Sequence, residues 1–211
     1  MKVAVLGASG WIGSQIVEEA VTRGHQVIAL VRNPSAIERQ DVEVRQLDVL
    51  AEQDFAQALQ GVDTVIASIG GRAAGNHDMV ERSAAKLLEQ LPNSGVKRLL
   101  WVGGAGSLEV APGVQLVTVP DFPAEYKDEA LAQSQALQVF RNSDSPLNWT
   151  FVSPAAEIFP GKKVGQFRVG GDQLLTDAQG HSKISVADFA SAMLDELETA
   201  KHAKQRISVA Y

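Results

Sequence analysis

Hydrophobic positions form two alternating patterns along the chain. The first is a short run rich in apolar residues, which predicts a strand buried in a sheet. Such runs lie at residues 3–6, 27–31, 42–47, 64–67, 97–102, 147–152 and 207–210. The second repeats apolar residues every three or four positions, as in an amphipathic helix, at residues 12–23, 52–59, 76–91, 124–141 and 189–197. The alternation predicts the α/β class, with a doubly wound parallel sheet covered by helices on both faces.

The first strand leads directly into three glycines and then into a helical pattern. Gly7 would permit the tight turn, Gly10 would let a pyrophosphate approach the backbone, and Gly13 would let the helix pack close to the strand. The first helical residues, Trp11 and Ile12, would turn free N–H groups toward the anion. Strand, glycine turn and helix occur in the required order, which favours dinucleotide binding over a glycine-rich turn without a ligand.

The residue after the second strand bears on the choice of nucleotide. A site that prefers NAD usually has an acid here, about twenty residues past the glycines, and the acid binds the ribose 2′-hydroxyl. This chain has Arg32 instead, and a guanidinium suits the 2′-phosphate of NADP. Ser9, inside the glycine turn, would add a hydroxyl donor. The sequence therefore predicts NADP(H) in preference to NAD(H), the alternative being that Arg32 is an ordinary solvated loop residue.

Two motifs resemble the atypical and extended members of the short-chain dehydrogenase/reductase superfamily. One is the G-x-x-G-x-x-G spacing at residues 7–13, and the other is Asn-Trp-Thr-Phe-Val-x-Pro at residues 148–154. At its closest, the chain resembles small NAD(P)-binding proteins described as NADH-flavin reductases. The resemblance implies a Rossmann fold.

We expect a single NAD(P)-binding domain over residues 1–211. Its core would comprise residues 1–152 and the closing elements at residues 185–211. A small substrate-side segment would occupy residues 153–184, and residues 161–175 within it suggest a hairpin.

The resemblance also implies roles for residues beyond the glycine turn. An acid in the position of Asp48 contacts the adenine amino group in the family; the alternative is that Asp48 caps the helix at residues 52–59. The loop after Pro154 would border the nicotinamide. The turn after the fourth strand would leave room for the adenine-side ribose and the pyrophosphate, and it comprises Ser68, Ile69 and Gly70.

The usual acid–base pair of the superfamily is incomplete in this chain. Tyr126 falls at the tyrosine of its Tyr-x-x-x-Lys motif, but Ala130 stands in the lysine position. Lys127 cannot substitute, because neighbouring residues point about 100° apart on a helix. The superfamily also carries a serine or threonine after the fifth strand, where this chain has Ser107. Ser107 and Tyr126 are therefore the candidate catalytic residues, the alternatives being a loop serine and a surface or packing tyrosine.

Composition narrows the range of partners. The net charge of −6 argues against general binding to nucleic acids or anionic membranes, and the absence of cysteine excludes disulfides and thiol catalysis.

The four histidines are far apart in sequence, so we expect no metal site; His77, followed by an aspartate, is interpreted as a helix cap. No apolar run has membrane-span length, and the first strand leaves no room for a signal peptide. We expect a cytoplasmic protein.

These observations favour an NADPH-dependent reductase that transfers a hydride to a small electron acceptor such as a flavin or quinone, since this needs little acid catalysis. One alternative is a non-catalytic NADP-binding redox sensor with a protein partner. Another is an epimerase or dehydratase of sugar nucleotides, for which the chain is short and lacks the lysine. A homodimer formed through a pair of helices is common in the superfamily.

Overall fold

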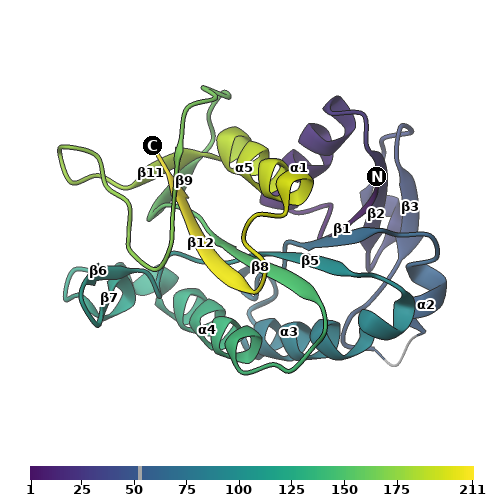
Figure 1. Ribbon diagram of the computed structural model, residues 1–211, viewed down its shortest axis with the longest axis horizontal. Helices are drawn as coiled ribbons and strands as arrows, with labels where there is room; N and C mark the ends of the chain where they lie inside the picture. The colour runs from purple at the N-terminus through teal and green to yellow at the C-terminus, as the bar shows by residue number, and fades with distance from the viewer. Residues whose placement is uncertain (52–53) are drawn as a thin grey trace.

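The computed structural model describes residues 1–51 and 54–211. Within them, the central sheet has eight strands in the order β10-β12-β8-β5-β4-β1-β2-β3 (Figure 1). The strands are β1 (Lys2–Leu6), β2 (Gln26–Val31), β3 (Glu43–Gln46), β4 (Thr64–Ala67), β5 (Arg98–Val102), β8 (Asn148–Ser153), β10 (Arg168–Gly170) and β12 (Gln205–Ala210). All neighbouring strands are parallel except β10 and β12. The strand order reverses between β1 and β4, the place where such sheets bind ligands.

Helices cover both faces of the sheet, with α1 and α5 on one side and α3 and α4 on the other (Figure 1). The helices are α1 (Trp11–Thr22), α2 (Phe55–Ala58), α3 (Asp78–Gln90), α4 (Ala124–Arg141) and α5 (Val186–Thr199). The predicted α/β class and doubly wound, mainly parallel sheet are confirmed.

Two hydrophobic cores separate the sheet from its helices. Alternate residues of β1 divide between them: Val3 and Val5 pack beneath α1 and α5, while Ala4 and Leu6 pack beneath α3 and α4. This division explains the unbroken apolar run in the sequence, because both faces of the strand are buried.

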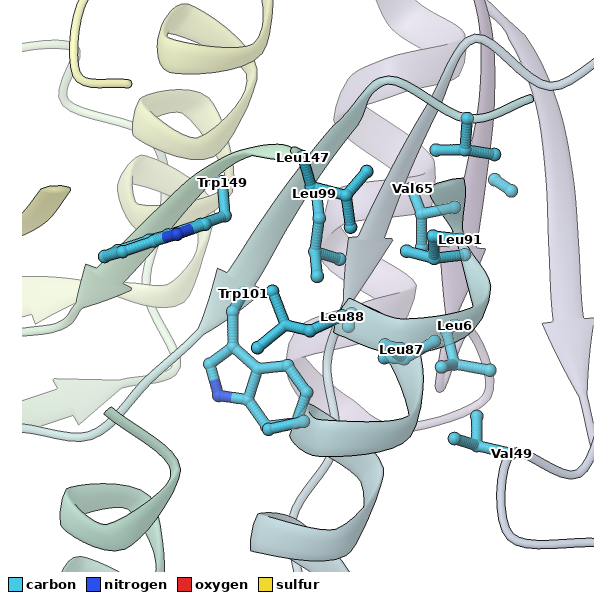
Figure 2. Close-up of a cluster of buried hydrophobic side chains, with 14 of the residues drawn as sticks. Leu6, Val49, Val65, Leu87, Leu88, Leu91, Leu99, Trp101, Leu147 and Trp149 are labelled. Carbon is cyan, nitrogen blue, oxygen red and sulfur yellow. The ribbon is translucent and has the colours of Figure 1, made fainter. Parts of the chain in front are cut away.

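The core beneath α3 and α4 consists mainly of leucine and valine side chains, with Trp101 and Trp149 at one end of the group that Figure 2 shows. The Phe140 ring lies 5.4 Å from the Trp101 ring, 5.3 Å from Trp149 and 5.7 Å from Phe151, measured between centroids. Each buried large apolar side chain contributes about 1.5–3 kcal/mol. This packing fixes α4 against β5 and β8, so that the first turns of α4 lie at the carboxyl edge of the sheet.

Shorter elements lie between the main ones. The pairs are β6 (Glu109–Ala111) with β7 (Val114–Gln115), and β9 (Glu157–Phe159) with β11 (Lys183–Ser185); the 3-10 turns are η1 (Pro34–Ala36), η2 (Arg72–Ala74), η3 (Pro92–Ser94) and η4 (Leu116–Thr118). The prediction of a hairpin within residues 161–175 is wrong. Gly170 instead pairs with Ser208 of β12, and β10 extends the edge of the main sheet. Arg168 anchors it by donating to the carbonyl oxygen of Tyr211, a contact that local sequence does not reveal.

The helix N-termini differ in detail from the expected caps. Asp54, not Asp48, caps α2 by accepting from the Ala56 N–H at 2.8 Å; residues 52–53 of the expected helix lie outside the described residues. His77 is the N-cap residue of α3, as expected, but its side chain accepts from no backbone N–H of the helix and instead contacts Glu129. At the start of α5, Ser185 is the cap, and its hydroxyl accepts from the Asp188 N–H at 3.1 Å.

Candidate nucleotide-binding site

A cavity of about 890 Å³ opens at the carboxyl edge of the sheet, where the strand order reverses. The ends of β1 to β4 and the first turns of α1 and α3 form its walls. Ten of the twelve predicted cofactor-binding residues line it: Gly7, Ser9, Gly10, Trp11, Ile12, Arg32, Asp48, Ser68, Ile69 and Gly70. Its volume lies within the range of small-molecule and cofactor sites.

The three glycines of the turn have different structural constraints. Gly7 has a φ of +78°, and a Cβ there would lie 2.1 Å from the Ser68 carbonyl oxygen. At Gly13 a Cβ would lie 2.1 Å from the Gly7 carbonyl oxygen. Both positions therefore require glycine for the fold itself. Gly10 is different, because an added Cβ would meet only the Gly7 carbonyl oxygen, at 3.2 Å, and would otherwise project into free space.

The N-terminus of α1 faces the cavity without a side-chain cap. Gly10 is the N-cap residue and has no side chain to accept from the first N–H groups; its own carbonyl oxygen accepts from the Ser14 N–H at 2.8 Å. A helix leaves its first N–H groups without intrahelical partners, and its dipole makes this end positive. Trp11 and Ile12 line the cavity at this point. The turn therefore fits the pyrophosphate of a dinucleotide.

Arg32 and Asp48 lie on the part of the cavity formed by β2 and β3. Arg32 is exposed, and its carbonyl oxygen accepts from the Gln46 side-chain amide at 3.0 Å, which ties the end of β2 to the end of β3. Asp48 Oδ1 accepts from the Leu50 N–H at 3.0 Å, which closes a local turn. Charge and position at Arg32 suit a ribose 2′-phosphate.

Two further residues of the cavity escaped the sequence analysis. Ser83 of α3 is buried, and its hydroxyl has no hydrogen-bond partner among the described residues. A serine within the buried stripe of an amphipathic helix, beside Val80 and Leu87, is the signal that could have identified it. Arg72 also lines the cavity, from the segment after β4. Its loop position carries no motif.

The remaining predicted cofactor residues, Gly13 and Pro154, do not line the cavity. Gly13 lies beneath the glycine turn, where it permits the close approach described above. Pro154 is buried at the end of β8.

Ser107 is buried away from the cavity. Its hydroxyl accepts from Arg206 Nη1 at 3.2 Å, and Arg206 Nε donates to Asp172 at 2.7 Å. Burial tends to raise the pKa of Asp172, but hydrogen bonds and charge from Arg206 and Arg141 outweigh it and lower the pKa. Ser107 thus contacts the buried arginine of a half-exposed ion-pair cluster, which ties the segment after β5 to β12.

Tyr126 lies on the first turn of α4, is 47% exposed and does not line the cavity. The Arg72 guanidinium lies over its ring, 4.5 Å from the centroid. Ala130, in the position of the superfamily's lysine, is buried. The structure therefore brings neither candidate catalytic side chain into the cavity wall.

The described residues contain no group of three His, Asp or Glu side chains placed to hold a metal ion. Within residues 1–51 and 54–211, no helix combines the length and apolar character that crossing a membrane requires.

Fold and site together define a Rossmann-type nucleotide-binding protein. The chain belongs to the NAD(P)H-binding family, whose profile matches residues 7–199. It is 41% identical to the uncharacterized protein YwnB of Bacillus subtilis, over 99% of this chain and 98% of YwnB.

Solved structures extend the likeness. A candidate NADH-flavin reductase from Streptococcus pneumoniae is 38% identical, with a TM-score of 0.90 over 100% of this chain and 99% of that one. A candidate epimerase from Bacteroides thetaiotaomicron is 34% identical, with a TM-score of 0.90 over 100% and 96% of the two chains.

Proposed function

We propose that this protein is an NADPH-dependent reductase that passes a hydride to a small acceptor such as a flavin or quinone. One observation carries the proposal: the uncapped N-terminus of α1 and the guanidinium-bearing end of β2 open onto one cavity at the strand-order reversal. The first suits a pyrophosphate and the second suits a 2′-phosphate. The 38% identical relative described as a candidate NADH-flavin reductase supports the same reaction class.

When bound, NADPH would supply the hydride, and the chain would supply binding and orientation. The amides at Trp11 and Ile12 would hold the pyrophosphate, and Gly10 would leave room for it. Arg32 would pair with the 2′-phosphate. Asp48 would accept from the adenine amino group.

The choice of acceptor follows from the position of both candidate catalytic residues, Ser107 and Tyr126, outside the cavity lining. The Ser107 hydroxyl is bound to Arg206 outside the cavity, and Tyr126 has no lysine one turn along the helix. A carbonyl substrate would need a positioned acid as its oxygen gains charge. Flavins and quinones can take their proton from solvent, and their reduction therefore suits this site better than carbonyl reduction or the chemistry of the epimerase-like relative.

The direct test is NADPH oxidation, followed at 340 nm, with free flavins, simple quinones and no acceptor. Turnover with an acceptor above the rate without one supports the reductase. The placement of Ser107 and Tyr126 outside the cavity favours a second function, a redox sensor that binds NADP without turnover. Tight NADPH binding with no oxidation in any arm would support the sensor and contradict the reductase.

A further inference from the structure

One face of α4 holds the segment that follows β4. Tyr126, Glu129 and Gln133 are spaced i, i+3 and i+7, so they lie along the same side of the helix. Glu129 Oε2 accepts from the Gly71 N–H at 3.0 Å and from the Arg72 N–H at 2.9 Å. The same oxygen lies 3.0 Å from His77 Nδ1. A single carboxylate thus holds the backbone at the start of η2 and the His77 side chain after it.

Gln133 connects this face to the core. Its side-chain amide donates to the Ile69 carbonyl oxygen at 2.9 Å and accepts from Trp101 Nε1 at 3.0 Å. Trp101 is fully buried. Side chains of α4 therefore hold the segment from Ile69 to His77 in a fixed position relative to the sheet, although this segment has no regular structure beyond η2.

The result of this anchoring is the position of Arg72. Its backbone is held by Glu129, and its guanidinium lies 4.5 Å above the ring centroid of Tyr126. Within residues 1–51 and 54–211, no carboxylate oxygen forms an ion pair with this guanidinium. Arg72 lines the same cavity as Gly10 and Trp11. An arginine that is stacked, without an acidic partner, on a cavity wall suits a planar or tetrahedral oxyanion.

We propose that Arg72 binds a phosphate group in the cavity, and that Tyr126 is a positioning residue for its guanidinium. This inference rests on the proposed binding of NADPH. The favoured source is the cofactor's pyrophosphate, because Arg72 shares the cavity with the N-terminus of α1. The other source is the phosphate of an acceptor such as FMN. In either case the α4 face that bears the superfamily's Tyr-x-x-x-Lys pair would here serve to hold a loop.

The chain contains its own binding probe. Trp11 is 49% exposed and lines the cavity, whereas Trp101 and Trp149 are 0% and 4% exposed. A ligand in the cavity should therefore alter Trp11 fluorescence selectively. The experiment titrates NADP⁺ into the wild type and into Arg72→Gln, Arg72→Lys, Tyr126→Phe and Tyr126→Leu. Arg82→Gln, which removes an exposed charge from α3, is the matched control.

Arg72→Gln should weaken NADP⁺ binding about tenfold, the lower end for a hydrogen bond to a charged group. Arg72→Lys should lose less NADP⁺ affinity than Arg72→Gln, because lysine keeps the positive charge and lacks only the planar fork of N–H donors. Tyr126→Leu should weaken binding about two- to fivefold, as expected for an exposed cation–π contact. Tyr126→Phe keeps the ring and should bind like the wild type. The double variant Tyr126→Leu/Arg72→Gln should bind no more weakly than Arg72→Gln alone, since both act through one guanidinium.

A second titration distinguishes the two phosphate sources. FMN and riboflavin differ by one phosphate, and quenching of flavin fluorescence reports their binding without turnover. If Arg72 holds the cofactor's pyrophosphate, Arg72→Gln weakens NADP⁺ binding and leaves the ratio of FMN affinity to riboflavin affinity unchanged. If Arg72 holds the acceptor's phosphate, Arg72→Gln lowers that affinity ratio instead.

Wild-type affinity of Arg72→Gln for both NADP⁺ and FMN would overturn the phosphate site, while the proposed function would stand. A wild type that binds neither NADP⁺ nor NADPH would refute both. Equal losses of NADP⁺ affinity in Tyr126→Phe and Tyr126→Leu would show that the Tyr126 hydroxyl is required for binding. This result would contradict the proposal that the ring positions the Arg72 guanidinium.

Discussion

The turn after β1 and the segment after β4 line the same cavity, but the fold holds them in different ways. The turn is held by its own backbone: the Gly10 N–H donates to the Gly7 carbonyl oxygen at 3.0 Å, and the Ser14 N–H to that of Gly10 at 2.8 Å. The segment after β4 depends on Glu129 and Gln133, which lie more than fifty residues later in the chain. One wall of the cavity is local in sequence, and the other is assembled from distant elements.

This difference has a practical consequence. A substitution at Gly10 should act on the ligand directly, because an added side chain there would project mainly into free space. A substitution in a distant anchor should instead act through the position or stability of a whole segment. Variants at Gly10 and Arg32 should change ligand affinity directly, whereas variants at Asp188 and Ser107 should change the stability of the fold.

Gly10→Val should abolish NADPH binding while the protein stays folded. The branched side chain would occupy the space in front of the uncapped α1 N-terminus. Gly171→Val is the matched control, because a Cβ at that position meets no atom within 4 Å. Trp11 fluorescence titration measures the affinity and circular dichroism checks the fold. Normal NADPH binding by folded Gly10→Val would refute the proposed site.

Asp188→Asn should lower the free energy of unfolding by about 3 kcal/mol at pH 7, as expected for breaking a buried, charged hydrogen-bond network. The buried Asp188 carboxylate accepts from the Val164 and Gly165 N–H groups at 2.9 and 2.8 Å and from the Tyr211 hydroxyl at 2.6 Å. An asparagine side chain would direct N–H groups at some of these donors. Asp177 is the matched control, because its exposed carboxylate also accepts from backbone N–H groups. Asp177→Asn should lower the free energy of unfolding much less than Asp188→Asn.

The pH dependence of this effect has a definite sign. Burial tends to raise the pKa of Asp188, but the hydrogen bonds from Tyr211, Val164, Gly165 and Ser185 outweigh it and lower the pKa. A lowered pKa stabilises the folded state above the unfolded value of about 3.9 and loses this contribution as the pH falls through the folded value. The stability difference between wild type and Asp188→Asn, measured by urea unfolding, should therefore narrow below about pH 4. A constant difference from pH 7 to pH 3 would contradict the assigned network.

The same division explains what the sequence could and could not predict. The glycine turn was recognisable because strand, glycines and helix are adjacent in sequence, and Arg32 because it directly follows a clear strand. The cavity brings these together with Asp48 and Ser68 because parallel strands end at one edge.

Contacts between distant segments were not predictable. Nothing near Arg72 indicates that Tyr126 and Glu129 hold it, and nothing near Ser107 indicates its bond to Arg206. The start of α5 lies between these cases. Ser185 Oγ accepts from the Asp188 N–H and donates to the Asp188 carboxylate, while the Ser185 N–H donates to the Tyr211 hydroxyl. The apolar pattern at residues 189–197 predicted this helix, but it identified neither its start at Val186 nor Ser185 as its cap.

Arg32→Asp should bring the affinity for NADH level with that for NADPH or above it. The wild type should prefer NADPH about tenfold, the lower end for a charge-assisted hydrogen bond, because Arg32 is exposed. Added salt should narrow the preference. Arg82→Asp makes the same charge change on α3, outside the cavity, and should keep the wild-type ratio. Both cofactors are titrated at two salt concentrations, and equal wild-type affinity for the two would show that Arg32 does not contact the 2′-phosphate.

The smallest effect should come from Ser107→Ala, which tests whether this residue belongs to the site or to the fold. Its hydroxyl accepts from Arg206 Nη1 at 3.2 Å, and Arg206 also donates to Asp172. Loss of one such bond should lower the free energy of unfolding by about 1 kcal/mol, with turnover changed less than tenfold. Ser153→Ala is the matched control: this serine is also buried, but its hydroxyl has no hydrogen-bond partner among the described residues, so its loss should be close to neutral. Urea unfolding and NADPH oxidation measure the two quantities. A thousandfold loss of turnover in Ser107→Ala, with stability and cofactor affinity intact, would instead identify Ser107 as a catalytic residue.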